Sequence, residues 1–548
     1  MIITEQVDLF GEVNTDGVSI DESAQRLHVS PATIRNWLKT GYLKPAGRGQ
    51  ITEESLIHFQ DQIVGTEKLN QRANKSSKDS HDHEALATSF INRAQSKASI
   101  LSHLGEEYEA CLSDSYRNKE GIYYTPAHVV RDLFFKPQED IGKATFCDPC
   151  CGSGNFILRA LEIGFKPENV YGYDVDPVAI EITKARIRQF CGYNSSNIQT
   201  MDFLSAASIG HAQHFDYIYT NPPWGKKLTK EEKELFGTKF GTGSSVDTCS
   251  LFFFACLACL NHEGTLGLLL PESFFNISTF EHARLKALSL TVNRLVDYGK
   301  AFKGLLTKAQ AIVLTNKPAE LNDLVKCENS CGSTRRSVRS FLSNPKSILN
   351  LYCDHKSADT LEYLFSIPHI NLAERASWGL GIVTGNNEKF IVPAPKEGYL
   401  PVFKGSDITQ SELKKPNSYI PSDFSQYQQV APLTLYLAKE KLIYKFISSR
   451  LCFYHDTKQR FVLNSANVLI PDADFPVSTK VLGLLLNSDF MNWMFSSIFS
   501  THKILRGDLE ALPIYSQFLK NESHFNEQQY LEDLNIIKEE NGTYRIKR

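Results

Sequence analysis

Between residues 121 and 318, short apolar runs alternate with segments whose apolar residues recur at helical spacing. Residues 144–147, 170–173 and 215–220 are apolar runs of strand length, and residues 156–163, between the first two, carry a helical pattern. Strands that alternate with helices form a parallel sheet covered by helices on both faces. We therefore predict a doubly wound α/β domain over residues 85–320, which starts with a helix at 85–112.

A separate helical pattern occupies residues 15–65. Residues 21–28 have apolar positions at helical spacing, and Ser30 with Pro31 is typical of an N-cap and a first helical position. This second helix ends at Gly41, and a basic turn and a third helix follow. Helix, tight turn, helix and wing is the order of a winged helix-turn-helix. Residues 66–84 are almost wholly polar and predict a linker.

The pattern changes beyond residue 320. Prolines, short β-rich runs such as 441–454 and irregular loops predict a separate α+β domain over residues 321–525. The charged segment 526–548 predicts a helical tail.

Composition agrees with this division. A chain of 548 residues is too long for one core, and its 42% hydrophobic and 22% charged residues are typical of a soluble globular protein. There is no signal-peptide pattern and no apolar run long enough for a bilayer, so we expect a cytoplasmic protein with no membrane partner. Twelve scattered cysteines suit a reducing cytosol, and we expect no metal site. The net charge of −3 argues mildly against nucleic-acid binding, although local basic patches can supply the field.

The first strand runs into a turn that contains Gly152 and Gly154. Glycine lets backbone amides approach a ligand that a Cβ would block. Asp174 ends the next strand, where an acid can accept both hydroxyls of a ribose. The turn lacks the third glycine of dinucleotide-binding proteins, and Asp148 would repel a pyrophosphate. S-adenosylmethionine, with its cationic tail, fits these residues better. The alternative is a glycine turn that only packs the strand on the helix.

The strand at 215–220 ends in Asn221, Pro222, Pro223 and Trp224. Two prolines cannot continue a ladder, so the chain turns at the carboxyl end of the strand, where ligands of open α/β sheets bind. The side-chain oxygen of Asn221 and the carbonyl of Pro222 would offer two acceptors to one amino group, and a planar base could stack on Trp224. This pattern predicts methyl transfer to an amino nitrogen, in which fixed dipoles rather than a strong base determine the rate.

These motifs resemble those of the γ-class, amino-group-specific DNA methyltransferases, which include the TaqI-type adenine enzymes. The resemblance covers about residues 115–515 and implies a Rossmann-like domain that binds S-adenosylmethionine. A departure is Cys151, where this turn commonly has a small neutral residue. The cofactor-binding residues that the resemblance implies are Tyr124, Thr125, Pro126, Asp148, Cys150, Gly152, Gly154, Asn155, Phe156, Asp174, Val175, Asp202 and Phe203.

The same resemblance implies a catalytic loop at Asn221, Pro222, Pro223 and Trp224, with Phe302 on the second face of the target base. Beyond residue 400 the chain resembles the target-recognition domain of these enzymes more loosely. Between residues 404 and 460, nine basic residues outnumber five acidic ones. This surplus favours a DNA-backbone surface that includes Lys404, Lys441 and Lys445, whereas an ordinary solvated face is the alternative.

The unit at 15–65 resembles the winged helix-turn-helix of MerR and excisionase proteins. This resemblance implies that Arg35 and Asn36 face the major groove and that Arg48 lies on the wing. It leaves open whether the unit aids substrate binding, acts at the enzyme's own promoter or contacts another protein.

We therefore expect a site-specific adenine-N6 DNA methyltransferase that flips its target adenine out of double-stranded DNA. It would be the modification enzyme of a restriction-modification system, with a cognate restriction endonuclease encoded nearby. Three alternatives stay open: a modification subunit that needs a separate specificity chain, a protein or RNA amino-group methyltransferase, and a DNA-binding regulator with an inert methyltransferase fold.

Overall fold

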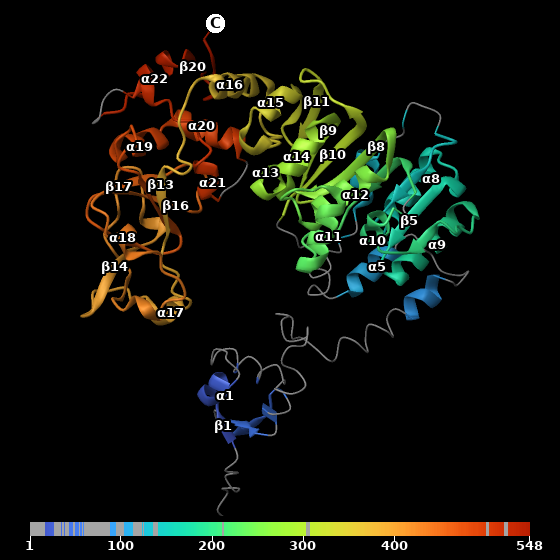
Figure 1. Ribbon diagram of the computed structural model, residues 1–548, viewed down its shortest axis with the longest axis horizontal. Helices are drawn as coiled ribbons and strands as arrows, with labels where there is room; N and C mark the ends of the chain where they lie inside the picture. The colour runs from blue at the N-terminus through green and yellow to red at the C-terminus, as the bar shows by residue number, and fades with distance from the viewer. Residues whose placement is uncertain are drawn as a thin grey trace, which may run out of the picture. The chain divides into compact units, whose positions relative to one another are not determined.

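The computed structural model places these elements in two compact units, Met1–Ser96 and Lys97–Arg548 (Figure 1). No described helix is both long and apolar enough to cross a membrane. The residues that the structure describes are 17–26, 34, 38, 43–47, 50–53, 55–56, 59, 88–94, 104–112, 123, 125–134, 137, 141–210, 213–302, 307–499, 503–519 and 524–547.

The first unit contains a small antiparallel sheet and a helix. The strands pair in the order β1 (Gly17–Ser19), β3 (Gln50–Thr52) and β2 (Pro45–Gly47), and α1 (Ile20–Arg26) follows β1 directly. The first helix predicted there coincides with α1. The predicted linker at 66–84 and the residues Arg35, Asn36 and Arg48 lie outside the described part of the chain. The core residues described in this unit are Val18, Ala24, Ile34, Leu43, Ile51, Leu56 and Phe59.

A nine-stranded mixed sheet forms the centre of the second unit, in the order β12-β11-β9-β10-β8-β7-β4-β5-β6. The five strands from β6 to β8 run parallel, whereas β10 runs antiparallel to both of its neighbours. The strands are β4 (Phe146–Asp148), β5 (Val170–Asp174), β6 (Ile198–Thr200), β7 (Phe215–Thr220), β8 (Leu260–Pro271), β9 (Leu290–Gly299), β10 (Ala309–Pro318), β11 (Leu324–Asn329) and β12 (Gly332–Ser337).

The predicted all-parallel sheet is therefore wrong on the side of β10 and β12. A strand buried on both faces is an apolar run whichever way it points, so residues 309–314 do not reveal their direction in the sequence. The sheet also continues past residue 320, where we predicted the domain to end, because β11 pairs with β9 and β12 pairs with β11. The hydrophobic core around this sheet extends to Leu351.

Helices cover both faces of the sheet. The chain leaves β4 towards β6 and then returns through β7 to β8, and right-handed crossovers place the helices of the two halves on opposite faces. The first group packs together, as does the second (Figure 1). The first group is α7 (Ala127–Leu133), α8 (Asn155–Ile163) and α9 (Pro177–Cys191); the second is α10 (Phe203–Ser208), α11 (Lys230–Phe240), α12 (Thr248–Ala258) and α14 (Glu281–Leu288). The predicted helix at 85–112 is described as helical only at 88–94 and in α5 (Leu104–Cys111).

The C-terminal region has two small sheets and a helical layer. A four-stranded antiparallel sheet has the order β13-β19-β16-β17, and a three-stranded sheet has the order β15-β14-β18. Its strands are β13 (Ala376–Leu380), β14 (Tyr399–Phe403), β15 (Tyr419–Pro421), β16 (Lys441–Lys445), β17 (Phe453–Asp456), β18 (Phe461–Val462) and β19 (Ala466–Pro471). Its helices are α16 (His355–Ser366), α17 (Asn387–Phe390), α18 (Leu433–Tyr436), α19 (Thr479–Leu486), α20 (Asp489–Ile498) and α21 (Arg506–Leu509), with α15 (Val338–Leu342) preceding them.

The predicted helical tail is wrong in part. Residues 526–548 begin with a short helix, α22 (Glu527–Asp533), and continue as the hairpin β20 (Ile536–Lys538) and β21 (Tyr544–Ile546). Tyr530 and Tyr544 are buried in the C-terminal core. The segment has enough large apolar residues to pack on that core, although its charged residues dominate the sequence.

Candidate active site

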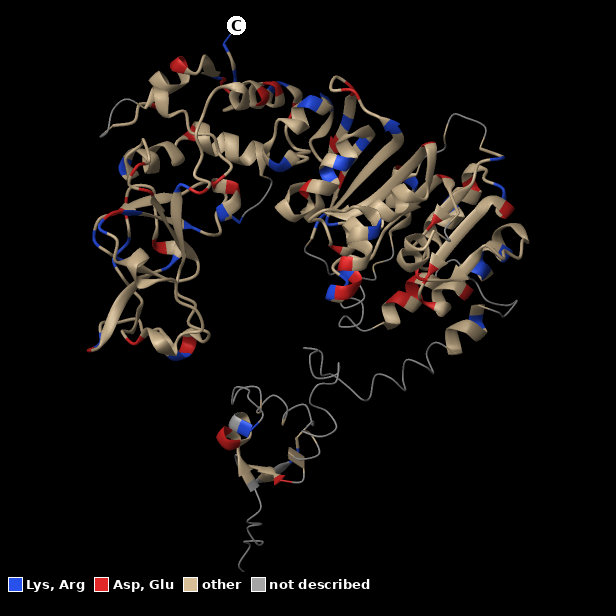
Figure 2. Cartoon of the chain, viewed as in Figure 1, with Lys and Arg blue, Asp and Glu red and all other residues tan. Residues whose placement is uncertain are grey.

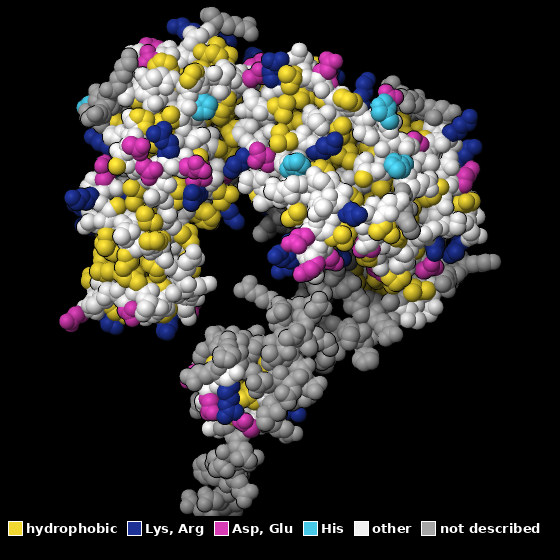
Figure 3. All heavy atoms as spheres, in the orientation of Figure 1, with side chains coloured by type: hydrophobic (Ala, Val, Ile, Leu, Met, Phe, Trp, Pro, Cys, Tyr) yellow, Lys and Arg dark blue, Asp and Glu magenta, His cyan; other side chains and the backbone are white. Residues whose placement is uncertain are grey.

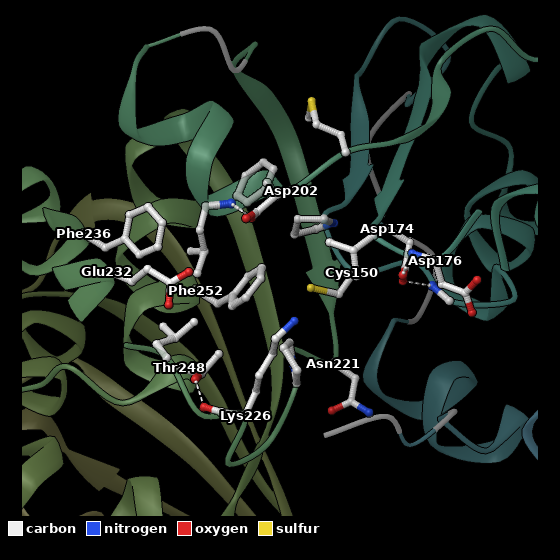
Figure 4. A pocket seen from close by; sticks show the side chains of 18 of the residues that line it. Cys150, Asp174, Asp176, Asp202, Asn221, Lys226, Glu232, Phe236, Thr248 and Phe252 are labelled. Carbon is white, nitrogen blue, oxygen red and sulfur yellow. Dashed lines mark hydrogen bonds between the residues drawn. The ribbon is translucent and has the colours of Figure 1, made fainter. Parts of the chain in front are cut away.

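A pocket of about 290 Å³ opens at the carboxyl edge of the parallel strands. Asp174 and Asp176 lie on one side of it and Phe236 and Thr248 on the other, with Cys150, Lys226 and Asn221 between them (Figure 4). The residues that line it are Tyr123, Pro149, Cys150, Gly152, Asp174, Val175, Asp176, Pro177, Met201, Asp202, Phe203, Leu204, Asn221, Pro223, Lys226, Leu228, Glu232, Phe236, Thr248 and Phe252.

The glycine turn after β4 forms one wall. Gly154 has a φ of 87°, and a Cβ built on it would lie 2.7 Å from Thr183 Cγ2 of α9, so both the backbone angle and the close packing require glycine. Gly152 donates its N–H to Asp174 Oδ2 at 2.9 Å, and its carbonyl accepts a hydrogen bond from Thr183 Oγ1 at 2.8 Å. The turn is therefore fixed to β5 and α9 before any ligand binds.

Two acids lie at this turn: Asp148 is buried, and Asp174 is half-buried in the pocket lining. Burial raises the pKa of Asp148 to about 7 and that of Asp174 to about 6. Asp148 accepts a hydrogen bond from Cys150 N–H at 3.2 Å, and Asp174 Oδ1 accepts one from Asp176 N–H at 2.9 Å. Burial disfavours the ionised form of a carboxyl, whereas a nearby cation stabilises it. A bound cation would therefore promote the loss of the protons from these two carboxyls.

The far end of the pocket is apolar. Val175 exposes 56% of its surface, which is unusual for valine, and lines the pocket. Phe203 is buried and stacks between Tyr173 and Phe252, with ring centroids 6.1 and 6.4 Å apart. Asp202 caps α10 and accepts hydrogen bonds from Leu204 N–H and Ser205 Oγ at 3.1 and 3.0 Å. A flat aromatic ligand with one polar edge fits this end.

Asn221 stands where β7 ends, at the edge of the pocket. Its Nδ2 donates to Tyr123 O at 2.8 Å, which fixes the direction of the amide. Its Oδ1 is one of the few buried side-chain oxygens in the described residues without a hydrogen-bond partner. A buried acceptor without a partner is costly, and it indicates a group that a ligand completes.

Three aromatic rings gather beside Asn221. Trp224 and Phe302 contact each other edge to face with centroids 5.1 Å apart, and Tyr123 lies 6.4 and 5.9 Å from them. Trp224 also donates its indole N–H to Leu269 O at 3.3 Å. The contact of these two rings leaves no space for a base between them, so a base that enters here must part Trp224 and Phe302.

The structure brings together only part of the predicted set. Cys150, Gly152, Asp174, Val175, Asp202, Phe203, Asn221 and Pro223 line the pocket, whereas Tyr124 lies outside the described residues. The predicted residues that do not line it are Thr125, Pro126, Asp148, Gly154, Asn155, Phe156, Pro222, Trp224 and Phe302. Asn155 does not line the pocket, and its Nδ2 instead donates a hydrogen bond to Thr125 O at 2.8 Å, which joins the start of α8 to the segment before α7.

Sequence reasoning missed the lining that comes from α11, α12 and the loop before them. Thr229 and Glu232 form a capping box at the start of α11, and this Ser/Thr-x-x-Glu spacing could have indicated a helix after the Asn-Pro-Pro-Trp loop. Gly225, with a φ of 69°, turns the chain, and Lys226 then points into the pocket (Figure 4).

The predicted DNA-contacting lysines differ in their surroundings. Lys441 is completely buried and donates its ammonium hydrogens to Asp456 Oδ2 at 2.6 Å and Tyr436 O at 2.7 Å. Its assignment to a DNA surface is therefore wrong, because a side chain in the core cannot reach a phosphate. Lys404 and Lys445 are partly exposed.

Charge on the C-terminal region occurs in separate groups. Figure 2 shows Lys and Arg positions scattered along the cartoon of this region, with no continuous stripe in this view. Figure 3 shows hydrophobic side chains gathered over the part that holds β14 and α18. Leu433 and Leu437 expose 40% and 47% of their surfaces there.

Two family models match the chain. N-6 DNA Methylase matches residues 101–289, and the TaqI-like C-terminal specificity domain matches residues 400–514. Type II methyltransferase M.VspI of Vibrio sp. (strain 343) is 48% identical over 406 residues, which cover 74% of this chain and 99% of that protein. Modification methylase CviBIII of Paramecium bursaria Chlorella virus NC1A is 24% identical over 216 residues, 39% of this chain and 54% of that protein. The DNA-bound structure of the Type IIL restriction-modification enzyme MmeI has 12% identity and a TM-score of 0.49, over 78% of this chain and 72% of that chain.

The mixed sheet, the matched families and the relative at 48% identity agree on a class, the N6-adenine DNA methyltransferases with a TaqI-like specificity domain. Within that class, the chain belongs to the type II methyltransferases of restriction-modification systems and is adenine-specific. The specificity domain matches within this chain, which argues against the modification-subunit alternative.

Proposed function

We propose that the pocket binds S-adenosylmethionine and that Asn221 binds the amino group of an extruded adenine beside it. The observation that carries this proposal is the buried, unpartnered Oδ1 of Asn221 at the pocket edge. Asp148 behind the glycine turn suits a cationic tail, Asp174 suits a ribose, and Val175, Phe203 and Phe252 suit an adenine ring.

When bound, S-adenosylmethionine supplies a methyl group on a positively charged sulfur. Asn221 Oδ1 and the carbonyl of Pro222 would accept the two hydrogens of the target amino group, which draws its nitrogen towards tetrahedral geometry. Positive charge that develops on that nitrogen is stabilised by these two oxygens, whose positions are fixed before the reaction. Burial of the site strengthens both contacts.

Adenine in a duplex is out of reach, so it must leave the stack. We infer that the extruded base enters between Trp224 and Phe302 and replaces their edge-to-face contact with stacking on its two faces. Tyr123 supports both rings and also holds the Asn221 amide through its carbonyl oxygen. One residue thus couples the base site to the amide that binds the amino group.

The test is the full-length Asn221→Ala variant. We expect kcat for DNA methylation to fall by at least about 100-fold, with the Kd for S-adenosylmethionine within about threefold of wild type, because the acceptor acts on the target base. Asn293→Ala, which removes an exposed amide on β9 that donates to Thr315 Oγ1, is the matched control. Wild-type methylation by Asn221→Ala would contradict the proposal, and so would an equal loss of cofactor binding.

We also infer that residues 15–65 form a winged helix-turn-helix that contacts double-stranded DNA. The helix α1, the three-stranded sheet and the small core of this unit support this interpretation. In full-length protein, replacing Arg35 and Asn36 together by Ala should weaken DNA binding by about tenfold or more and leave kcat at saturating DNA unchanged. Lys286→Ala on α14 is the control, and unchanged affinity of the double variant would exclude this role.

We further propose that the enzyme acts in the cytoplasm beside a cognate restriction endonuclease encoded nearby. The support is its membership of the type II methyltransferases. A host that receives the neighbouring nuclease gene should survive only when it also expresses this chain. Survival without the chain would contradict a cognate pair.

A further inference from the structure

Arg284 on α14 is a fully buried arginine with no ion pair in the part of the chain that the structure describes. Its guanidinium donates instead to four backbone carbonyls. Nη1 donates to Phe274 O and Ile277 O at 2.8 Å each, and Nη2 and Nε donate to Lys346 O and Ser347 O at 2.8 and 3.2 Å. The Arg284 side chain therefore connects α13 (Glu272–Asn276) and the residue that follows it with Lys346 and Ser347, about seventy residues later in the sequence.

A buried charge is costly unless hydrogen bonds compensate it, and an apolar side chain of similar size would fill this space without that cost. Burial lowers the pKa of Arg284 to about 10, so the group keeps its charge at neutral pH. What the guanidinium adds is the fixed direction of its N–H groups, which determines where the carbonyls of Lys346 and Ser347 point.

The backbone of that segment is unusual. Lys346 and Ser347 have φ angles of 54° and 50°, so two successive residues with side chains adopt the left-handed conformation. This conformation is unfavourable for residues other than glycine and persists only where its surroundings hold it. The carbonyl groups of these two residues, which this conformation orients, are the ones that accept hydrogen bonds from Arg284.

The same segment is bound to both domains. On the catalytic side, Leu349 N–H donates to Phe275 O at 2.9 Å. On the side of the C-terminal region, Lys346 Nζ donates to Gly507 O at 3.3 Å, and Asn350 Nδ2 donates to Ser497 O at 2.7 Å. The segment lies between the last strand of the large sheet and the first helix of the C-terminal region.

We propose that Arg284 and the left-handed turn at Lys346–Ser347 form a joint that fixes the specificity domain in its working position relative to the active site. DNA is read by one domain and methylated by the other, so an error at the joint displaces the target adenine from Asn221. A displacement of about 1 Å at a reacting centre is enough to lower a rate about 100-fold. Arg284 is thus a positioning residue, because neither it nor any of the four residues whose carbonyls it binds lines the pocket.

The test uses full-length Arg284→Lys, which keeps the charge but loses the planar fork of donors. The recognition site is first mapped by single-molecule sequencing of plasmid DNA from a host that expresses the wild-type chain. We expect kcat at that site to fall by about 10- to 100-fold, while the Kd for S-adenosylmethionine and the KM for DNA change by less than about threefold. Methylation of sites that differ by one base should rise relative to the cognate site.

Lys346→Ala keeps the test decisive if Arg284→Lys does not fold, since it removes the contact to Gly507 and the charge near Asp508 but keeps the carbonyl that Arg284 binds. Its kcat should fall by about three- to tenfold with unchanged cofactor affinity. Lys356→Ala, an exposed lysine on α16, is the matched control and should behave like wild type. Wild-type kcat and site preference in the folded variants would overturn the proposal, and so would losses of kcat that are matched by equal losses of cofactor binding.

Discussion

Asn221 in the catalytic domain and Asp456 in the specificity domain both hold side-chain oxygens out of reach of water, yet their partners differ. Asn221 Oδ1 has no hydrogen-bond partner in the described residues. Asp456 Oδ2 accepts from Lys441 Nζ at 2.6 Å and from Arg460 N–H at 2.9 Å, and its Oδ1 accepts from Arg460 Nη1 at 2.7 Å and from Lys458 N–H at 3.2 Å. One site is incomplete without a ligand, and the other is complete in the protein alone.

This difference separates a functional from a structural polar site. A buried acceptor without a partner costs stability, and it is tolerated where binding requires it. A buried ion pair with all its oxygens engaged holds strands together and has nothing left to offer a ligand. Both regions contained residues that the sequence analysis assigned to function, and of these two described sites the one at Asn221 has an unused acceptor.

Lys441→Ala should show the largest effect on stability. It leaves Asp456 buried without its main partner, which we expect to lower the free energy of unfolding by about 3–5 kcal/mol. Asn221→Ala removes an oxygen with no partner and one hydrogen bond to Tyr123 O, so its effect on stability should stay within about 1 kcal/mol. Urea denaturation gives the free energy of unfolding of both variants. A larger loss of stability in Asn221→Ala than in Lys441→Ala would contradict this distinction between the two sites.

Gly154→Ala should be the next most damaging change. The left-handed backbone and the collision with Thr183 together should lower the free energy of unfolding by about 3 kcal/mol and weaken cofactor binding. Gly192→Ala at the end of α9 has a similar φ of 73° but no atom within 4 Å of the new Cβ. It should cost only about 1 kcal/mol. Equal losses in the two variants would show that the contact with Thr183 is unimportant.

The acids of the glycine turn should make cofactor binding pH-dependent. Their folded-state pKa values, about 7 for Asp148 and about 6 for Asp174, lie above the ordinary value of 3.8. At pH values between the ordinary and the raised pKa, these two carboxyls hold more protons in the folded protein than in the unfolded one. The free energy of unfolding therefore falls as the pH rises from about 4 to 7. The affinity for a cationic ligand should rise over the same pH range, because a cation binds more tightly to the ionised acids.

We therefore expect the Kd for S-adenosylmethionine to fall by about tenfold between about pH 5.5 and 8, measured by calorimetry. Asp148→Asn should flatten this dependence while leaving the pocket formed. A Kd that rises with pH, or an unchanged slope in the variant, would contradict the role of these acids.

The smallest effects should come from Lys404→Ala and Lys445→Ala. Each removes a partly exposed cation, so each should weaken DNA binding by about three- to tenfold and lower the slope of affinity against salt by about one. Their stability should stay within about 0.5 kcal/mol of wild type. Filter binding over a range of salt concentrations tests this, and slopes equal to wild type would remove both lysines from the DNA surface.

The local features of the active site could be predicted from short sequence motifs. β7 spans the predicted residues 215–220, Asn221 follows it directly, and the glycine turn precedes α8, because glycine, proline and strand patterns constrain the backbone near them. The resemblance to γ-class enzymes rested on these local motifs, and the family matches confirmed its coarser part, an N6-adenine DNA methylase with a TaqI-like specificity domain.

Features that depend on contacts between elements were not predictable from these motifs and became visible only in the folded chain. The antiparallel direction of β10, the extension of the sheet by β11 and β12, the burial of Lys441 against Asp456 and the closing of the pocket by α11 and α12 each depend on contacts between separate elements. Strand direction and side-chain burial depend on which elements pack against each other. The pattern within one segment does not identify its packing partner.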